Sequence, residues 1–294
     1  MKKLITPLLL VIAIYSCETK KETASDTAAV APESNAITAI KIWETDTVFK
    51  TPESVFFDKE NNLLYVANIG NVPPTNKDSD GFISKLSTSG ELIELNWITD
   101  LHAAKGMGKI GNSLFVTNID EVVEIDINAG KIINRFAIDS AIFLNDITTA
   151  DDSTVYISDS GTNKIHALKN GQVSTWLQSE ELGNPNGLLH QGDKMMLATY
   201  GSNEYSAIDM TTKALTLLAD SLQGGDGVVA YGDDYIVSGW NGVVFHITAT
   251  GTKTLLIDTR AEAKNAADIE VIPENKIILV PTFFGNTVAA YEVK

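Results

Sequence analysis

The sequence predicts an all-β fold, a six-bladed β-propeller, over residues 37–294. A unit of about 40 residues recurs six times along this stretch. Each unit holds short runs of β-branched and aromatic residues bounded by Asn, Asp and Gly, which is the pattern of β-strands. The spacing stays even, without a domain break. Four strands in about 40 residues make one propeller blade, so six units predict six blades.

The first strand of each unit fixes the spacing of the repeat. Aligning the entries of these strands gives six equivalent positions: Glu53, Lys105, Asn145, Asn186, Asp226 and Ala267. The steps between them are 52, 40, 41, 40 and 41 residues. The long first step comes from an insertion near residues 70–81, which contains Pro73 and Pro74.

Second and third strands follow each entry. The second runs are 63–68, 113–118, 154–159, 196–200, 235–240 and 277–282. The third runs are 82–86, 121–126, 164–168, 205–209, 243–247 and 288–293. The third runs alternate with a period of two, as half-buried strands do.

A fourth strand completes each of the first five units. These runs are 92–98, 131–138, 172–177, 214–218 and 253–257. The sixth unit ends at Lys294 without one, so we expect residues 37–43 to pair onto the last blade. That pairing closes the ring and covers an exposed edge. Two sandwich domains are the alternative, which the even spacing disfavours.

Residues 1–16 have the features of a lipoprotein signal peptide. Lys2 and Lys3 precede an apolar run over residues 4–14, too short to span a bilayer stably. Cys17 follows Ile14-Tyr15-Ser16, a segment that resembles a bacterial lipobox, so we expect Cys17 to be lipidated. An ordinary signal peptide, or a buried Cys17, is the alternative. Cys17 is the only cysteine, which excludes an intramolecular disulfide.

Residues 17–36 predict a flexible tether. The segment is rich in Thr, Ala, Ser and charge and has no apolar period, so it cannot bury enough apolar surface to order itself. Together with Cys17 it predicts a protein of the cell envelope, lipid-anchored to a bacterial membrane on its periplasmic side or at the cell surface. We expect the lipid to be its one attachment to the membrane.

The charge of the chain is strongly acidic. Removing Lys2 and Lys3 with the signal peptide leaves 20 of the 22 basic residues against 38 acidic ones, a net charge of −18. Such a surface disfavours nucleic acid and anionic headgroups and attracts cations. We expect a monomer that binds a small-molecule substrate and no nucleic acid.

The six aligned positions predict a metal site. Innermost strands line the channel of a propeller, so their entry residues form a ring around its axis. Glu53, Asn145, Asn186 and Asp226 present oxygen atoms there. Two carboxylates and two amide carbonyls suit Ca²⁺ or another oxygen-preferring divalent cation, whereas Zn²⁺ prefers His and Cys. Asp146 and Asp268 each follow a ring position in the sequence. They are either partners that support the metal ligands or ordinary acidic residues of turns.

These four residues, in this order of blades, resemble the senescence-marker-protein/gluconolactonase-like six-bladed propellers. The resemblance covers residues 37–294 and implies a catalytic divalent metal held by Glu53, Asn145, Asn186 and Asp226. It implies that Asp226 is also the catalytic base or nucleophile. Lys105 lies near the position where lactonases of this family often carry a substrate-binding Arg. We therefore expect Lys105 to contact the substrate.

Two functions remain open from the sequence. The first is a metal-dependent hydrolase of a lactone or ester, acting at the mouth of the channel. The second is a non-catalytic propeller lipoprotein that binds a ligand or a protein at the same mouth. His166 and His246 fall in predicted third strands and are interpreted as ordinary strand residues. The four Trp residues are interpreted as packing residues, and a position lining a pocket is the alternative for Trp240, which follows a second strand.

Overall fold

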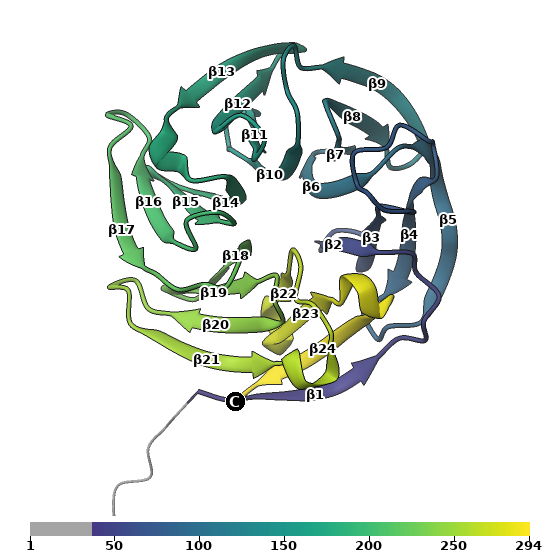
Figure 1. Cartoon of the computed structure of the whole chain (residues 1–294). Helices are drawn as coiled ribbons and strands as arrows, with labels where there is room; N and C mark the ends of the chain where they lie inside the picture. The colour runs from purple at the N-terminus through teal and green to yellow at the C-terminus, as the bar shows by residue number, and fades with distance from the viewer. Residues whose placement is uncertain (1–36) are drawn as a thin grey trace, which may run out of the picture. The chain divides into compact units, whose positions relative to one another are not determined.

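The computed structural model describes residues 37–294, which form a ring of six four-stranded antiparallel sheets (Figure 1). The predicted six-bladed β-propeller is confirmed. The predicted signal peptide, Cys17 and tether lie outside the described residues. No helix among residues 37–294 is long and apolar enough to cross a membrane.

The blades follow one another along the chain. The strands of blade one are β2 (Pro52–Asp58), β3 (Leu63–Asn68), β4 (Gly81–Ser87) and β5 (Leu92–Leu101). Those of blade two are β6 (Ala104–Ile110), β7 (Ser113–Asn118), β8 (Glu121–Asp126) and β9 (Lys131–Ala137). Those of blade three are β10 (Leu144–Thr149), β11 (Val155–Asp159), β12 (Lys164–Lys169) and β13 (Gln172–Gln178).

The second half of the ring repeats this order. The strands of blade four are β14 (Pro185–Gln191), β15 (Lys194–Thr199), β16 (Tyr205–Asp209) and β17 (Leu215–Ala219). Those of blade five are β18 (Gly225–Tyr231), β19 (Asp234–Gly239), β20 (Val243–Ile247) and β21 (Lys253–Asp258). Those of blade six are β22 (Glu270–Ile272), β23 (Ile277–Pro281), β24 (Val288–Val293) and β1 (Ala39–Glu44). Short 3-10 turns are η1 (Glu180–Leu182), η2 (Arg260–Glu262), η3 (Pro273–Asn275) and η4 (Phe283–Gly285).

The first described strand closes the ring, as predicted. β1 pairs antiparallel with β24, from Ala39 opposite Val293 to Glu44 opposite Ala289 (Figure 1). The backbone of Thr38 exchanges two hydrogen bonds with that of Lys294, at 3.1 and 2.9 Å. The outer edge of the last blade is therefore paired with the beginning of the domain.

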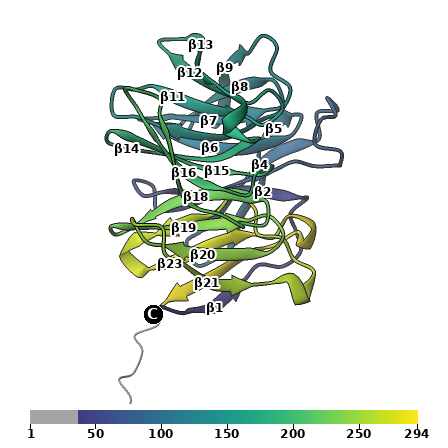
Figure 2. The same ribbon diagram turned by 60° about the vertical axis from the view of Figure 1, so that its left-hand side comes forward.

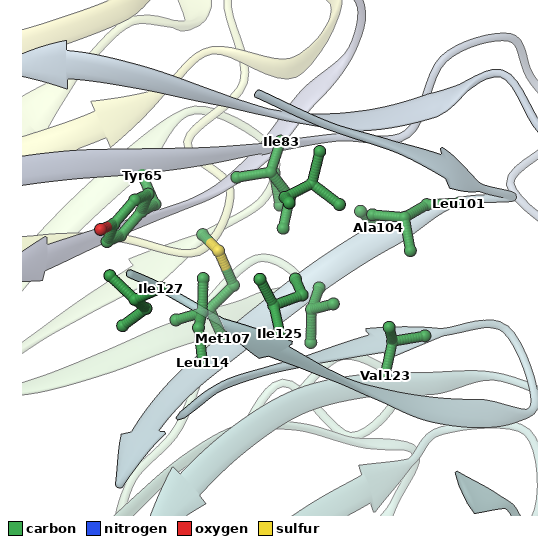
Figure 3. Close-up of a cluster of buried hydrophobic side chains, with 12 residues drawn as sticks. Tyr65, Ile83, Leu101, Ala104, Met107, Leu114, Val123, Ile125 and Ile127 are labelled. Carbon is green, nitrogen blue, oxygen red and sulfur yellow. The ribbon is translucent and has the colours of Figure 1, made fainter. Parts of the chain in front are cut away.

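The core lies between adjacent blades rather than at the centre of the ring. One cluster contains Ile83 and Leu101 of blade one and Met107, Leu114 and Ile125 of blade two (Figure 3). Similar clusters join the other neighbours, and the blades stack in succession around the ring (Figure 2). Apolar burial between blades thus fixes the axis at which the six inner strands meet.

Candidate metal and substrate site

A β-bulge sets each ring residue apart in the first five inner strands. In blade one the register passes from Pro52–Asn68 to Ser54–Ala67, which leaves Glu53 without a partner on β3. Equivalent shifts free Lys105, Asn145, Asn186 and Asp226 from regular pairing. A bulge redirects a side chain locally, and bulges are common next to functional sites. The repeat therefore turns these five side chains out of the regular pleat.

Hydroxyl groups of the second strands support the bulged backbone. Ser158 Oγ accepts a hydrogen bond from the Asp146 amide at 2.9 Å, and Ser238 Oγ accepts one from the Gly227 amide at 2.8 Å. Thr117 Oγ1 of blade two donates to the carbonyl of Asn145 in blade three at 2.5 Å. The bulges are thus held rigidly, and neighbouring blades are joined at the ring.

All five ring residues line one cavity of about 290 Å³. Glu53, Lys105, Asn145, Asn186 and Asp226 form its polar part and are all buried. The structure thus brings together every residue that the sequence predicted for the metal and substrate site. The sixth aligned position, Ala267, is also buried but supplies no polar side chain.

Three oxygen atoms of the ring are buried without a hydrogen-bond partner among the described residues. They are Glu53 Oε2, Asn186 Oδ1 and Asp226 Oδ1. A buried acceptor without a partner costs about 1–3 kcal/mol, and more when it is charged, so such atoms require an explanation. Three of them in one cavity are what a bound cation would satisfy together.

The two acids of the ring, Glu53 and Asp226, are buried in surroundings that disfavour their ionised form. Burial raises the pKa of Glu53 well above its usual value, and the nearby Asp226 and Asp268 raise it further, against the opposing charge of Lys105. Burial also raises the pKa of Asp226, with Asp268 and Asp146 acting in the same direction. A bound divalent cation would reverse this effect, because it stabilises the ionised carboxylates.

Lys105 is the one cation among the residues that line the cavity. Its Nζ donates one long hydrogen bond to the carbonyl of Ala103, at 3.4 Å, and lies 4.4 Å from the centre of the Phe143 ring. Burial lowers the pKa of Lys105 to about 8, although the charge of Glu53 opposes this. The ammonium group therefore keeps hydrogen-bonding capacity that a ligand in the cavity can use.

Asp146 and Asp268 form a second acidic layer, next to the ring in sequence. Asp146 accepts hydrogen bonds from the amides of Ile147 and Leu188, at 2.6 and 2.7 Å, and so joins blade three to blade four. Asp268 accepts one from Ser54 Oγ at 2.8 Å, which joins blade six to blade one. Asp146 is buried and Asp268 is partly buried, so they are supporting residues rather than exposed turn acids.

Glycines make room for this second layer. A Cβ atom on Gly106 would lie 2.6 Å from Asp146 Oδ1, and one on Gly227 would lie 2.5 Å from Asp268 Oδ1. Contacts this short do not occur at real Cβ atoms, so larger residues at these positions would displace the acids. The Gly that follows Lys105 and the Gly that follows Asp226 are therefore part of the site.

The other half of the cavity is apolar, and most of its residues were not predicted from the sequence. Its lining residues include Ile69, Pro74, Phe143, Tyr200, Trp240 and Phe283. Trp240 both packs against Phe283 and lines the cavity, whereas Trp43, Trp97 and Trp176 do not line it. Pro74 belongs to the predicted insertion, which therefore reaches the cavity. These residues lie in turns and loops of different blades, where no periodic pattern marks them.

Histidine does not contribute to the cavity. None of His102, His166, His190 and His246, all within residues 37–294, lines it. His166 and His246 lie on the third strands β12 and β20, as predicted. Across the same residues, no group of three or more His, Cys, Asp or Glu side chains is placed to hold a metal ion. A cation in the ring would therefore depend on the amide oxygens of Asn145 and Asn186.

Comparisons with known proteins bear on the fold. No protein-family model matches the sequence, and no curated protein matches it. Among solved structures, a gluconolactonase from Xanthomonas campestris matches with a TM-score of 0.67 and 14% identity, over 84% of this chain and 87% of that one. A catalytically inactive histidine-to-alanine variant of virginiamycin B lyase from Staphylococcus aureus, with quinupristin, matches with a TM-score of 0.62 and 12% identity, over 87% and 99%.

A chain of a nidogen/laminin complex also matches, with a TM-score of 0.59 and 18% identity, over 70% of this chain and 80% of that one. The three similar structures thus include a lactonase by name, a lyase by name and a protein in a protein–protein complex. At these identities the likeness establishes the propeller fold and no activity.

Proposed function

We propose that the protein is a divalent-metal-dependent hydrolase of a lactone or ester, acting in the cavity around the ring. The observation that carries the proposal is the set of three buried, unpartnered oxygen atoms on Glu53, Asn186 and Asp226. The Xanthomonas campestris gluconolactonase among the similar structures is consistent with it.

The ring fits a hard cation. Glu53, Asn145, Asn186 and Asp226 would hold it through two carboxylates and two amide oxygens, a donor set that suits Ca²⁺. Lys105 weakens the attraction for a cation, but its single long hydrogen bond leaves it free to turn toward a ligand. Bound there, Ca²⁺ would act as a Lewis acid and polarise the carbonyl group of the substrate.

The side chains of the cavity would then complete the reaction. The Asp226 carboxylate would accept a proton from water as the water oxygen attacks the acyl carbon. The C–O bond to the alkoxide breaks, and the alkoxide oxygen takes up the proton. The products are a carboxylic acid and a hydroxyl group, on one molecule when the substrate is a lactone, and at neutral pH the acid ionises and releases the second proton of the water to the solvent. Lys105 would donate a hydrogen bond to an oxygen of the substrate.

The two other functions have less support. The lyase variant among the similar structures is inactive after replacement of a histidine, and no histidine among residues 37–294 lines this cavity. A non-catalytic binding propeller gives no reason for two carboxylates, each with an unpartnered oxygen atom, to be buried beside a lysine.

A panel of lactones and esters, assayed with and without EDTA, tests the proposal. We expect hydrolysis that EDTA abolishes and that added Ca²⁺ restores. Asp226→Asn should lose this activity, whereas Glu292→Gln, on the outer part of blade six, should keep it. The absence of hydrolysis across the panel, in protein shown to contain Ca²⁺, would contradict the proposal and favour the binding propeller.

Membrane attachment is a separate part of the proposal. We propose that Cys17 is lipidated and that residues 17–36 connect the propeller to a bacterial membrane in the cell envelope. The support is the apolar run that precedes Cys17 and the lipobox-like segment next to it. One lipid chain gives only marginal binding to a bilayer, so a stably attached protein should carry more than one acyl chain.

A further inference from the structure

The cavity is divided into two chemically distinct halves. The ring supplies the polar half, and Ile69, Pro74, Phe143, Tyr200, Trp240 and Phe283 supply the apolar half. These six come from the loops of blades one, three, four, five and six. An apolar surface assembled from five blades beside two carboxylates is suited to the non-reacting part of a ligand.

The aromatic residues form a preformed wall. The Trp240 ring lies 5.6 Å from that of Phe283 and 6.3 Å from that of Tyr200, both edge to face. Phe284 lies 4.8 Å from Phe283 and 6.0 Å from Trp240. Edge-to-face contacts at these distances are favourable, so the rings support one another in place. Tyr200 and Phe284 nevertheless remain 47% and 54% exposed, which leaves apolar surface at the mouth.

The backbone at Phe283 adopts a strained conformation. Its φ angle is +47°, in the left-handed region that bulky residues avoid. Two hydrogen bonds hold this turn: Thr282 Oγ1 accepts one from the Thr287 amide at 3.1 Å and donates one to the Thr287 carbonyl at 3.0 Å. Strained residues kept in place by such networks concentrate at ligand sites. The strain here presents one aromatic ring to the cavity.

The apolar half offers few hydrogen-bond partners to the hydroxyl groups of a ligand. Besides the ring residues, its polar groups are the Tyr200 hydroxyl, the Trp240 indole N–H and Ser160, whose Oγ already donates to the carbonyl of Pro185 at 2.6 Å. An aromatic face can stack on the C–H face of a sugar, but the hydroxyl groups at its edge still need partners. Leaving them unpaired against this wall would be costly.

We propose that the substrate is a lactone or ester with an aryl or hydrocarbon substituent, not a polyhydroxylated sugar lactone. Trp240, Phe283 and Tyr200 are its specificity-determining residues, and the ring receives the carbonyl end. That the substrate is a lactone or an ester rests on the proposed function, whereas the apolar character of its substituent rests on the aromatic wall alone. The cavity of about 290 Å³ lies near the lower end for small-molecule sites, which suits two fused rings or one ring with a short chain.

Four lactones test the activity arm: glucono-1,5-lactone, δ-valerolactone, δ-decalactone and dihydrocoumarin. We expect kcat/KM for dihydrocoumarin and δ-decalactone to exceed that for δ-valerolactone by tenfold or more, since each buried methylene is worth about fourfold. Glucono-1,5-lactone should be the poorest of the four. The inference is overturned if glucono-1,5-lactone is hydrolysed as well as dihydrocoumarin.

A binding experiment can test the apolar ligand class without turnover and without a metal ion. Lactams resist hydrolysis, so δ-valerolactam and 3,4-dihydro-2-quinolinone can be titrated into EDTA-treated protein by calorimetry. We expect the quinolinone to bind at least tenfold more tightly. If this preference holds and no lactone is hydrolysed, the proposed function fails and the apolar ligand class stands. Equal affinities would overturn the inference even if hydrolysis were found.

Two variants and a control test whether the aromatic wall determines the preference for the larger ligand. Trp240→Ala should reduce the preference for the larger lactam by about tenfold. Tyr200→Ala, at a half-exposed position that the fold tolerates more easily, should reduce it severalfold. Trp176→Ala is the matched control, because Trp176 packs on Tyr156 and Lys213 away from the cavity. The assignment is wrong if both wall variants bind the two lactams as the wild type does.

Discussion

Glu44 provides a quantitative test of how the ring is closed. It lies at the end of β1, and its Oε1 accepts hydrogen bonds from Lys264 Nζ at 2.5 Å and from Thr287 Oγ1 at 2.7 Å. Lys41 Nζ donates to Oε2 at 3.0 Å. The side chain is only 19% exposed. Glu44 therefore ties the closing strand to the loop before β22 and to the start of β24, and Glu44→Gln removes the charge but keeps the shape.

The magnitude follows from the pKa. Burial by itself would raise the pKa of Glu44, but hydrogen bonds from Lys264, Thr287 and Lys41 outweigh it and lower the pKa from 4.5 to about 2. A difference of this size corresponds to about 3 kcal/mol. Gln keeps one acceptor oxygen, so we expect Glu44→Gln to lose about 2 kcal/mol at pH 7, or roughly 4–8 °C in Tm for a domain of this size.

The assay is urea unfolding of both proteins as a function of pH. Because the folded-state pKa is lowered, the contribution of Glu44 is complete above about pH 4.5 and is lost as the pH falls toward 2. The difference between wild type and variant should therefore shrink over that range. Glu292→Gln on β24 is the control: within residues 37–294 the Glu292 carboxylate forms one ion pair, with Lys294 at 3.2 Å, so the change should alter stability by less than about 0.5 kcal/mol. Equal stability of Glu44→Gln and wild type at pH 7 would refute the reasoning.

Three further predictions concern the site and the anchor. Ca²⁺ at 100 times its Kd should stabilise the wild-type fold by about 2.7 kcal/mol. We expect Asp226→Asn and Glu53→Gln each to abolish this stabilisation and Asp268→Asn to reduce it much less, as measured by thermal melts with Ca²⁺ or EDTA. Burial raises the pKa of Asp268 to about 7 and also raises those of Glu53 and Asp226, so the metal-free fold should lose stability as the pH rises from about 4 to 7. The Tm increase with Ca²⁺ should consequently be larger at pH 8 than at pH 5, and the opposite order would count against the site. Cys17→Ser should move the protein from the membrane fraction to the soluble fraction, and a variant that still pellets with membranes would refute lipidation.

The repeat made the fold and the ring predictable together. Strand alternation and a step of 40 or 41 residues defined the blades, and the same alignment selected Glu53, Asn145, Asn186 and Asp226. A periodic structure places equivalent positions at equivalent heights around the axis, so one correct alignment locates all of them. The closing strand was predictable because the last unit lacked one strand.

The apolar wall could not be predicted in this way. Tyr200, Trp240 and Phe283 lie in turns that follow second strands, where the repeat imposes no residue type. Their convergence depends on loop conformation, including the positive φ of Phe283, which the sequence does not reveal. The second acidic layer was only half predictable, because Asp146 and Asp268 depend on space left by glycines in neighbouring blades.

Calcium binding to the ring is the central claim, and equilibrium dialysis against ⁴⁵Ca²⁺ measures it most directly. The chain is first stripped with EDTA and then dialysed at pH 7.5 in parallel with Asp226→Asn. We expect one tightly bound ion per wild-type chain and the loss of that ion in the variant. Wild-type protein that binds no Ca²⁺ at millimolar concentration, or a variant that binds it equally well, would contradict the account.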